Sequence, residues 1–148
     1  AMDTMRMESG FLHWGHDISP EENQYQAGLD FTISYKKKFD FIGKKKLLKI
    51  KNQKLERRFV MLVLEDGSPG KPLLLSEEPI YLNDKVIGKT TSGNYSFNYN
   101  KNLSFGYINT KYSNEQLLNK KIFIEIEKKK HEFKLILKPL KDHKFKDF

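Results

Sequence analysis

Residues 57–66, RRFVMLVLED, and residues 122–139, IFIEIEKKKHEFKLILKP, decide the fold of this chain. The first is a short apolar run that ends before the turn residues Gly67, Pro69 and Gly70. The second alternates apolar with polar residues, a period typical of β-strands that bury one face, and is long enough for two strands with a turn around residues 128–130. The side chains expected to face the core are Ile122, Ile124, Ile126, Phe133, Leu135 and Leu137.

Two further segments have the same character. Residues 79–93, PIYLNDKVIGKTTSG, predict a hairpin that turns at residues 83–84 and carries a bulge at Gly88. Residues 90–93, TTSG, could present hydroxyls, but after a strand we expect them to form a tight turn. Another strand is expected at residues 103–108, LSFGYI. Short strands at this spacing predict a mainly β fold with a minor α part, namely a small closed Greek-key-like β-barrel, with a β-sandwich as the alternative.

The first third of the chain differs from the rest. We expect residues 1–10 to be the end of a helix that has methionines on its apolar side and stops at Gly10. Residues 13–28 are rich in turn signals, and residues 29–35, LDFTISY, alternate as a strand does. Residues 44–55, KKKLLKIKNQKL, predict a short basic helix. Its residues expected to be buried are Leu47, Leu48 and Ile50.

The composition narrows the classes of function. The chain has 148 residues, of which 27 are basic and 19 acidic, and it has no cysteine, which excludes disulfides, thiolate metal sites and a cysteine nucleophile. This fits a cytoplasmic location. No run of about 18 apolar residues is present, so we expect no membrane partner. Only three of the 27 basic residues are arginine, the residue that nucleic-acid recognition favours. We therefore expect no nucleic-acid partner and interpret the lysines as a solvated surface.

Few residues form patterns typical of a catalytic or metal site. His13 and His16, three residues apart, and Asp17 are candidate metal ligands, but the glycines around them argue against a helix that would bring them together. His131 and His143 lie in an expected hairpin tip and in the tail. We therefore expect structural roles for the histidines and no metal. No nucleophile–base pattern and no phosphate-binding glycine loop is present.

Glu8 is the strongest candidate for a binding residue. It follows Arg6 in a segment whose neighbours are expected to be buried, and a buried carboxylate is unfavourable unless donors satisfy it. A salt bridge with a nearby lysine is one explanation. The other is a ligand with paired N–H donors, such as the 2-amino and ring N–H groups of a pterin, which match the two carboxylate oxygens.

Several segments together resemble the glycine-cleavage T-protein (aminomethyltransferase) superfamily, whose members read L-R-x-E-x-G, W/Y-G-x-[DE]-[IL], E-A-G-L and D-F-I-G-[KR] in this order, followed by barrel motifs. The matching segments are 5–10 (MRMESG), 14–18 (WGHDI), 26–29 (QAGL), 40–44 (DFIGK), 78–81 (EPIY), 86–88 (VIG), 91–93 (TSG) and 105–108 (FGYI). Residues 11–17, FLHWGHD, are more similar to the folate regions of dimethylglycine and sarcosine dehydrogenases.

The resemblance implies the carboxy-terminal part of a tetrahydrofolate-dependent one-carbon enzyme, which hands a methylene or methyl unit from a methylated-amine or glycine-derived substrate to tetrahydrofolate. Residues 1–54 then correspond to a helix/strand strip of the folate-binding domain, and residues 55–148 to the terminal barrel. Glu8 corresponds to the pterin-binding glutamate, and Lys37 lies near an arginine that contacts the folate tail. The family's catalytic residues lie upstream of Ala1, so we expect none in this chain and no activity from it alone. FAD in an upstream region is compatible with the dehydrogenase type.

The alternative is a stand-alone basic barrel that binds RNA or an acidic protein. Aromatic rings on a barrel surface stack with the bases of single strands, while lysines attract the phosphates. The best stretch for such a surface comprises Tyr95, Phe97, Tyr99 and Phe105 with Lys89 and Lys101.

Overall fold

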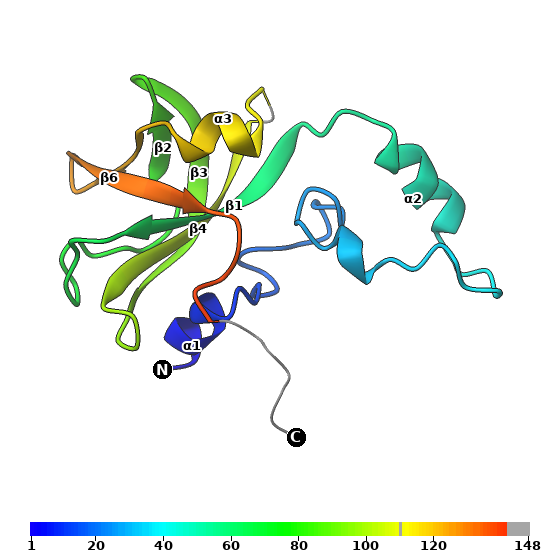
Figure 1. Cartoon of the computed structure of the whole chain (residues 1–148), viewed down its shortest axis with the longest axis horizontal. Helices are drawn as coiled ribbons and strands as arrows, with labels where there is room; N and C mark the ends of the chain where they lie inside the picture. Colours follow the sequence, from blue (N-terminus) through cyan, green and yellow to red (C-terminus); the bar gives the residue numbers. More distant parts are fainter. Residues whose placement is uncertain (110, 142–148) are drawn as a thin grey trace.

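The structure, a computed structural model, describes residues 1–109 and 111–141, with no side-chain description for residues 114 and 115. Its centre is a closed antiparallel barrel in the spatial order β1-β4-β3-β2-β5-β6 (Figure 1). Strands β2, β3 and β4 pair in sequence, and β1 pairs with β4, so the first four strands form a Greek key, as expected. The strands are β1 Arg57–Leu64, β2 Pro79–Leu82, β3 Lys85–Ser96, β4 Lys101–Asn109, β5 Ile122–Ile126 and β6 Lys129–Ile136.

Both predicted hairpins are present and turn through two residues with positive φ. Asn83 and Asp84 have φ of 48° and 61°, and Glu127 and Lys128 have φ of 50° and 62°. Two-residue loops of this kind match the right-handed twist of the paired strands. The register between β2 and β3 shifts at Ile80, which faces Gly88, so the predicted bulge is confirmed.

The alternation read from the sequence correctly identifies most of the barrel interior. Five of the six residues expected to face inward are buried, but Leu137 is 52% exposed because β6 ends one residue earlier. Helix α3, Asn114–Leu118, contributes Leu117 to the same core. The principal core residues are Val60, Leu62, Ile80, Leu82, Ile108, Leu117, Ile122, Ile124, Ile126, Phe133 and Leu135.

The predicted amino-terminal helix is α1, Met2–Glu8, and the chain leaves it through Gly10, which has φ of 74°. Of its methionines, only Met7 is buried, in a second apolar cluster with Val63, Leu103 and Phe105 of the barrel. Helix α1 therefore lies on the outside of β3 and β4.

The predicted strand at residues 29–35 is wrong. The structure has a single-turn 3₁₀ helix, η1 Asp30–Thr32, in which the Thr32 hydroxyl donates to the Leu29 carbonyl at 2.6 Å. A strand needs a neighbouring strand to satisfy its backbone, and this segment has none among the described residues, so local hydrogen bonds determine its conformation. Phe31, in the middle of this segment, is 80% exposed.

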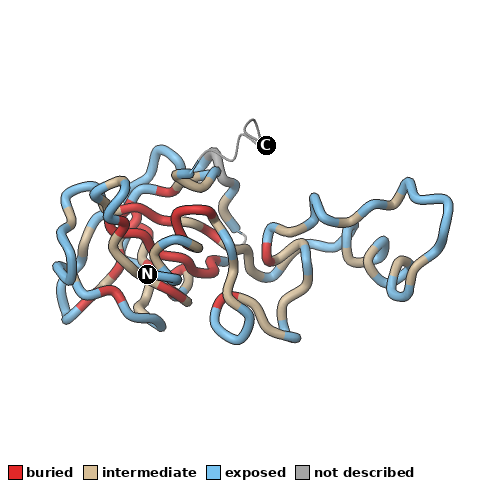
Figure 2. Tube along the Cα trace, turned by 90° about the horizontal axis from the view of Figure 1, so that it is seen from below, coloured by how far each residue is buried: buried red, intermediate tan, exposed pale blue. Residues whose placement is uncertain are grey.

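The predicted basic helix is present as α2, Lys44–Lys51, but its expected burial is wrong, since none of its residues is buried. Residues 28–54, which we call the arm, extend away from the barrel and contain no buried residue (Figures 1 and 2). The lysine-rich sequence permits a helix, but the described part of the chain leaves Leu47 and Ile50 only half-buried and Leu48 exposed. No described helix is long and apolar enough to cross a membrane.

Replacing Gly88 with alanine should destabilise the barrel strongly. A Cβ built on Gly88 lies 1.9 Å from the Tyr107 carbonyl oxygen, so β3 and β4 must separate to accept it. We expect a loss of about 3 kcal/mol in the free energy of unfolding, measured by urea denaturation. Gly15→Ala is the control, because that position has φ of 89° but open space around it, and should cost about 1 kcal/mol. A smaller loss for Gly88→Ala than for the control would contradict the packing argument.

Candidate functional site

Asp17 forms a buried polar cluster that joins the amino-terminal segment to the barrel. Its side chain is completely buried, and the Arg6 guanidinium pairs with Oδ2 at 2.6 Å. Oδ1 accepts hydrogen bonds from the hydroxyls of Thr91 and Ser92 at 2.6 and 2.7 Å. The backbone N–H of His13 also donates to Oδ2, at 2.8 Å. Four donors therefore satisfy the carboxylate, as a buried charge requires.

Two additional contacts complete this cluster. Arg6 donates from Nη2 to the Ser92 hydroxyl at 2.9 Å, and the Tyr107 hydroxyl donates to the Asp17 carbonyl at 2.8 Å. Burial raises the pKa of Tyr107 well above its ordinary value, so its hydroxyl remains a donor. The cluster thus joins the R-x-E, W-G-x-D, T-S-G and G-Y motifs, which lie far apart in the sequence.

This geometry corrects the sequence interpretation of residues 90–93 and shows what Asp17 contacts. The tight turn expected at residues 90–93 is wrong, because these residues lie inside β3. There Thr91 and Ser92 present their hydroxyls to Asp17. Asp17, considered as a metal ligand, holds Arg6 and the barrel instead. The rings of His13 and His16 contact each other with centroids 4.6 Å apart and planes tilted by 35°. The described residues contain no group of three possible metal ligands, and His143 lies outside them.

Glu8 lies at the end of α1 and is 3% exposed. Its Oε1 accepts from the Ser96 hydroxyl at 2.6 Å, and its Oε2 accepts from the Asn98 side-chain amide at 2.7 Å. Burial acts to raise the pKa of Glu8, but hydrogen bonds from Ser96 and Asn98 and the positive charge of Lys141 outweigh it, so the pKa lies below its ordinary value. The carboxylate therefore stays ionised at neutral pH. Its direct partners are neutral donors rather than the lysine considered from the sequence.

Lys37, the second candidate binding residue, is an exposed residue of the arm, whereas Glu8 is buried against the barrel. The structure brings Glu8 into contact with the turn between β3 and β4 instead. Sequence reasoning missed Ser96 and Asn98, although the polar run in residues 94–100, NYSFNYN, is a signal for a hydrogen-bonding turn.

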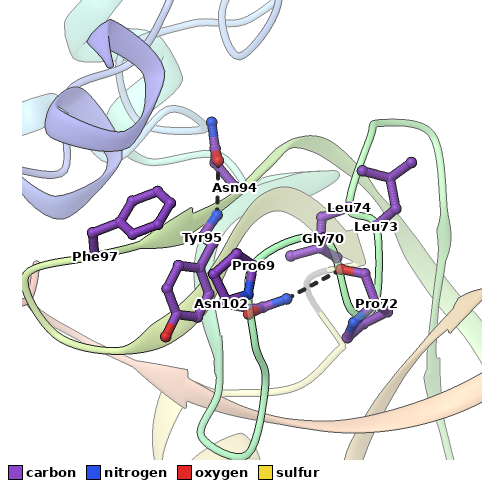
Figure 3. Close-up of a pocket in the computed structure, with 9 residues that line it drawn as sticks. All are labelled: Pro69, Gly70, Pro72, Leu73, Leu74, Asn94, Tyr95, Phe97 and Asn102. Atoms are coloured by element: carbon purple, nitrogen blue, oxygen red, sulfur yellow. Dashed lines mark hydrogen bonds between the residues drawn. The ribbon is translucent and has the colours of Figure 1, made fainter.

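A small pocket lies next to this turn (Figure 3). It has a volume of about 110 Å³ and contains no carboxylate, histidine or lysine. Asn102 donates to the Pro72 carbonyl at 3.2 Å across its floor. Tyr95 and Phe97 line the pocket, while the intervening Ser96 contacts Glu8. The residues of the pocket are Pro69, Gly70, Pro72, Leu73, Leu74, Asn94, Tyr95, Phe97 and Asn102. Its chemistry offers no acid, base or strong nucleophile.

The aromatic surface considered for RNA binding is not formed as expected. Phe105 is 1% exposed and packs in the apolar cluster under α1, so its ring is unavailable for stacking. Tyr95 and Phe97 pack edge to face with ring centroids 5.1 Å apart. Each ring therefore covers part of the other, and that part cannot stack on a base. The geometry gives this alternative no support.

The sequence and the fold of this chain both match known proteins. Residues 57–142 match the glycine cleavage T-protein C-terminal barrel domain, so the chain belongs to this family. It is 35% identical over 142 residues to mitochondrial dimethylglycine dehydrogenase of Homo sapiens, covering 95% of this chain and 16% of that protein. It is also 34% identical over 140 residues to aminomethyltransferase of Listeria welshimeri, covering 94% of this chain and 36% of that protein. The resemblance found in the sequence is thus confirmed.

The fold has a counterpart among solved structures. The crystal structure of the glycine cleavage system aminomethyltransferase T from Bartonella henselae superposes with a TM-score of 0.79 at 22% identity, covering 94% of this chain and 37% of that chain. The predicted mainly β barrel is therefore confirmed as well. The chain spans about a third of the length of the aminomethyltransferases and about a sixth of the dimethylglycine dehydrogenase.

Replacing Asp17 with asparagine should destabilise the chain strongly. Asparagine has one acceptor oxygen, so whichever way its amide turns two of the four donors lose their acceptor, and the guanidinium loses its counter-charge. We expect a loss of about 3–5 kcal/mol in the free energy of unfolding, the range for breaking a buried ion pair, measured by urea denaturation. Asp84→Asn is the control, because Asp84 pairs with Lys130 but its side chain is 92% exposed, and it should have little effect. Equal losses for both variants would show that the Asp17 cluster does not hold the two parts together.

Proposed function

We propose that the chain is the carboxy-terminal part of a tetrahydrofolate-dependent one-carbon enzyme of the aminomethyltransferase or folate-linked dimethylglycine or sarcosine dehydrogenase type. The observation that carries the proposal is the match of nearly the whole chain to two such enzymes. The resemblance of the sequence assigns pterin binding to Glu8, which is buried and ionised. The complete enzyme would transfer a methylene or methyl unit from an amine to tetrahydrofolate.

The chemistry of Glu8 supports a role in pterin binding. An ionised carboxylate has about four lone-pair sites, and Ser96 and Asn98 occupy one on each oxygen. The backbone N–H of Asn98 also acts on the carboxylate as a donor, and the remaining lone pairs can accept a further N–H group. The 2-amino and ring N–H groups of a pterin are spaced as a planar pair that two carboxylate oxygens accept side by side.

The charge of the arm supports Lys37 as a contact for the folate tail. The arm has nine lysines and two aspartates, so it accounts for seven of the eight net positive charges of the chain. The glutamate tail of folate carries carboxylates, which such a field attracts. We place the tail near Lys37 and its neighbours Lys36 and Lys38, and we place any FAD of the dehydrogenase type in a region outside this chain.

The exposed apolar residues of the arm support packing against another part of the folate-binding region. Phe31, Phe39 and Ile42 are each at least 80% exposed, an unusual arrangement for three large apolar side chains of one segment. The relatives contain long regions that this chain does not cover. We propose that residues 1–54 belong to the folate-binding domain and that the arm packs against such a region, with residues 55–148 as a separate barrel domain.

Replacing Glu8 with glutamine should weaken tetrahydrofolate binding by the complete enzyme, the product of the whole reading frame that encodes this chain. Glutamine keeps the shape but presents an N–H₂ group to a donor, so one charge-assisted hydrogen bond becomes repulsive. We expect a loss of about 2–3 kcal/mol, or about 30- to 150-fold in affinity, measured by calorimetric titration. Unchanged affinity, or a loss explained by a large fall in melting temperature, would make Glu8 a structural residue.

Replacing Ile42 with aspartate should lower the melting temperature of the complete enzyme but not that of residues 1–148. The side chain is fully exposed here, so the melting temperature of residues 1–148 should hardly change. In the complete enzyme the same substitution would bury a charge at the proposed contact and lower the melting temperature by several degrees. Val86→Asp, which changes an exposed apolar residue of β3, is the control and should behave alike in both proteins. If Ile42→Asp has no effect in the complete enzyme, the proposed packing of the arm is wrong.

A further inference from the structure

Strands β1 and β6 close the barrel over only a short distance. Residues 61–63 of β1 pair with residues 134–136 of β6. Among the described strand pairings, the first part of β6, residues 129–133, has a partner in β5 but none in β1. The chain after β1 does not fill this gap, because the backbones of Ser68 and Lys71 hydrogen-bond to each other and fold the loop on itself. The barrel therefore has an open mouth between the start of β6 and the loop that follows β1.

A cavity, which we call the mouth cavity, lies in this opening. Its volume is about 380 Å³, which is within the range of small-molecule sites, and the mouths of β-barrels are places where such sites occur. On its inner side are Ile126, which is buried in the barrel core, and Leu64, which packs against that core. Pro72 and Leu73 of the loop add further apolar surface. The mouth cavity therefore has an apolar wall that a hydrocarbon side chain can cover.

The inward-facing row of residues on β6 changes in character at the mouth cavity. Alternate residues of a strand share one face, and Leu135 and Phe133 of this row are buried in the barrel core. The next two members of the same row are His131 and Lys129, and both line the mouth cavity. Apolar packing therefore does not account for the residue types at these two positions.

The ionisable side chains around the mouth cavity carry both signs of charge and do not pair with each other. They are Asp66, Lys71, Glu127, Lys129 and His131. None of these side chains forms an ion pair or a hydrogen bond with another described residue. On the outward-facing side of β6, by contrast, Lys130, Glu132 and Lys134 each form an ion pair. The mouth cavity thus separates two carboxylates from two lysines and an imidazole, and a ligand between them can contact both sets.

We propose that the mouth cavity binds a small zwitterion with an apolar side chain, which is the chemistry of a free amino acid such as leucine. Its carboxylate meets the two lysines and His131, its ammonium group meets the two acidic side chains, and its hydrocarbon part covers the apolar wall. A ligand with only one charge satisfies one set of side chains and is repelled by the other. The inference does not depend on Glu8 or on folate binding, so its failure and the failure of the proposed function are distinguishable.

The first test is a titration of residues 1–148 with L-leucine, followed by NMR of the backbone amides. We expect saturable shifts at Leu64, Ile126 and His131, which line the mouth cavity. Three analogues each lack one part of leucine, since isovalerate has no ammonium group, isoamylamine has no carboxylate and glycine has no side chain. Each should bind about tenfold more weakly than leucine, because it loses one set of contacts. The inference is overturned if leucine shows no saturable binding, or if any of the three analogues binds as tightly as leucine.

The second test places the ligand with matched variants. Lys129→Gln and Asp66→Asn each remove one charge from the mouth cavity and should weaken leucine binding about tenfold. Lys130→Gln and Asp84→Asn are the controls, because Lys130 is the next residue of β6, faces outward and pairs with Asp84. All four side chains are exposed, so the melting temperature should hardly change. If neither cavity variant weakens binding, or if the controls weaken it as much, the proposed site is wrong.

Discussion

The ion pair between Arg6 and Asp17 is the interaction on which the arrangement of this chain depends. The barrel has its own core, and the first seventeen residues attach to it through Met7 and Leu12 in the second apolar cluster and through polar contacts. Thr91 and Ser92 connect the barrel to Asp17, whose buried carboxylate is satisfied because Arg6 and the His13 N–H also donate to it. The position of Glu8 follows from this attachment.

The barrel itself is held together by close backbone contacts as well as by apolar packing. Besides Gly88, Gly106 lies so near the Lys89 carbonyl that a Cβ there would be 2.5 Å from it. Gly93 is similarly close to Leu74 of the long connection between β1 and β2. The glycines in the I-G, T-S-G and G-Y motifs therefore allow close packing within the barrel. The polar residues beside them bond to Asp17 and so attach the amino-terminal segment.

The sequence was sufficient for most of the barrel, because alternation and turn residues act locally. The pattern around Ile122 to Ile126 is visible without knowing any other strand. The same reasoning failed for residues 29–35, because alternation indicates a strand only where a second strand satisfies its backbone. It also failed for Thr91 and Ser92, whose role depends on an aspartate more than seventy residues earlier in the chain. Glu8 could be singled out because a carboxylate among apolar residues is unfavourable in any fold, but its donors could not, since neither proximity nor period in the sequence relates them to it.

The long sequence separation within the polar contacts has a consequence for biosynthesis. Arg6 is 86 residues from Ser92, and Glu8 is 88 residues from Ser96. The amino-terminal segment therefore leaves the ribosome long before the strand that receives it exists. Until that strand has been made, the Arg6 guanidinium and the Glu8 carboxylate cannot form these contacts, so the amino-terminal segment joins the barrel only late in synthesis.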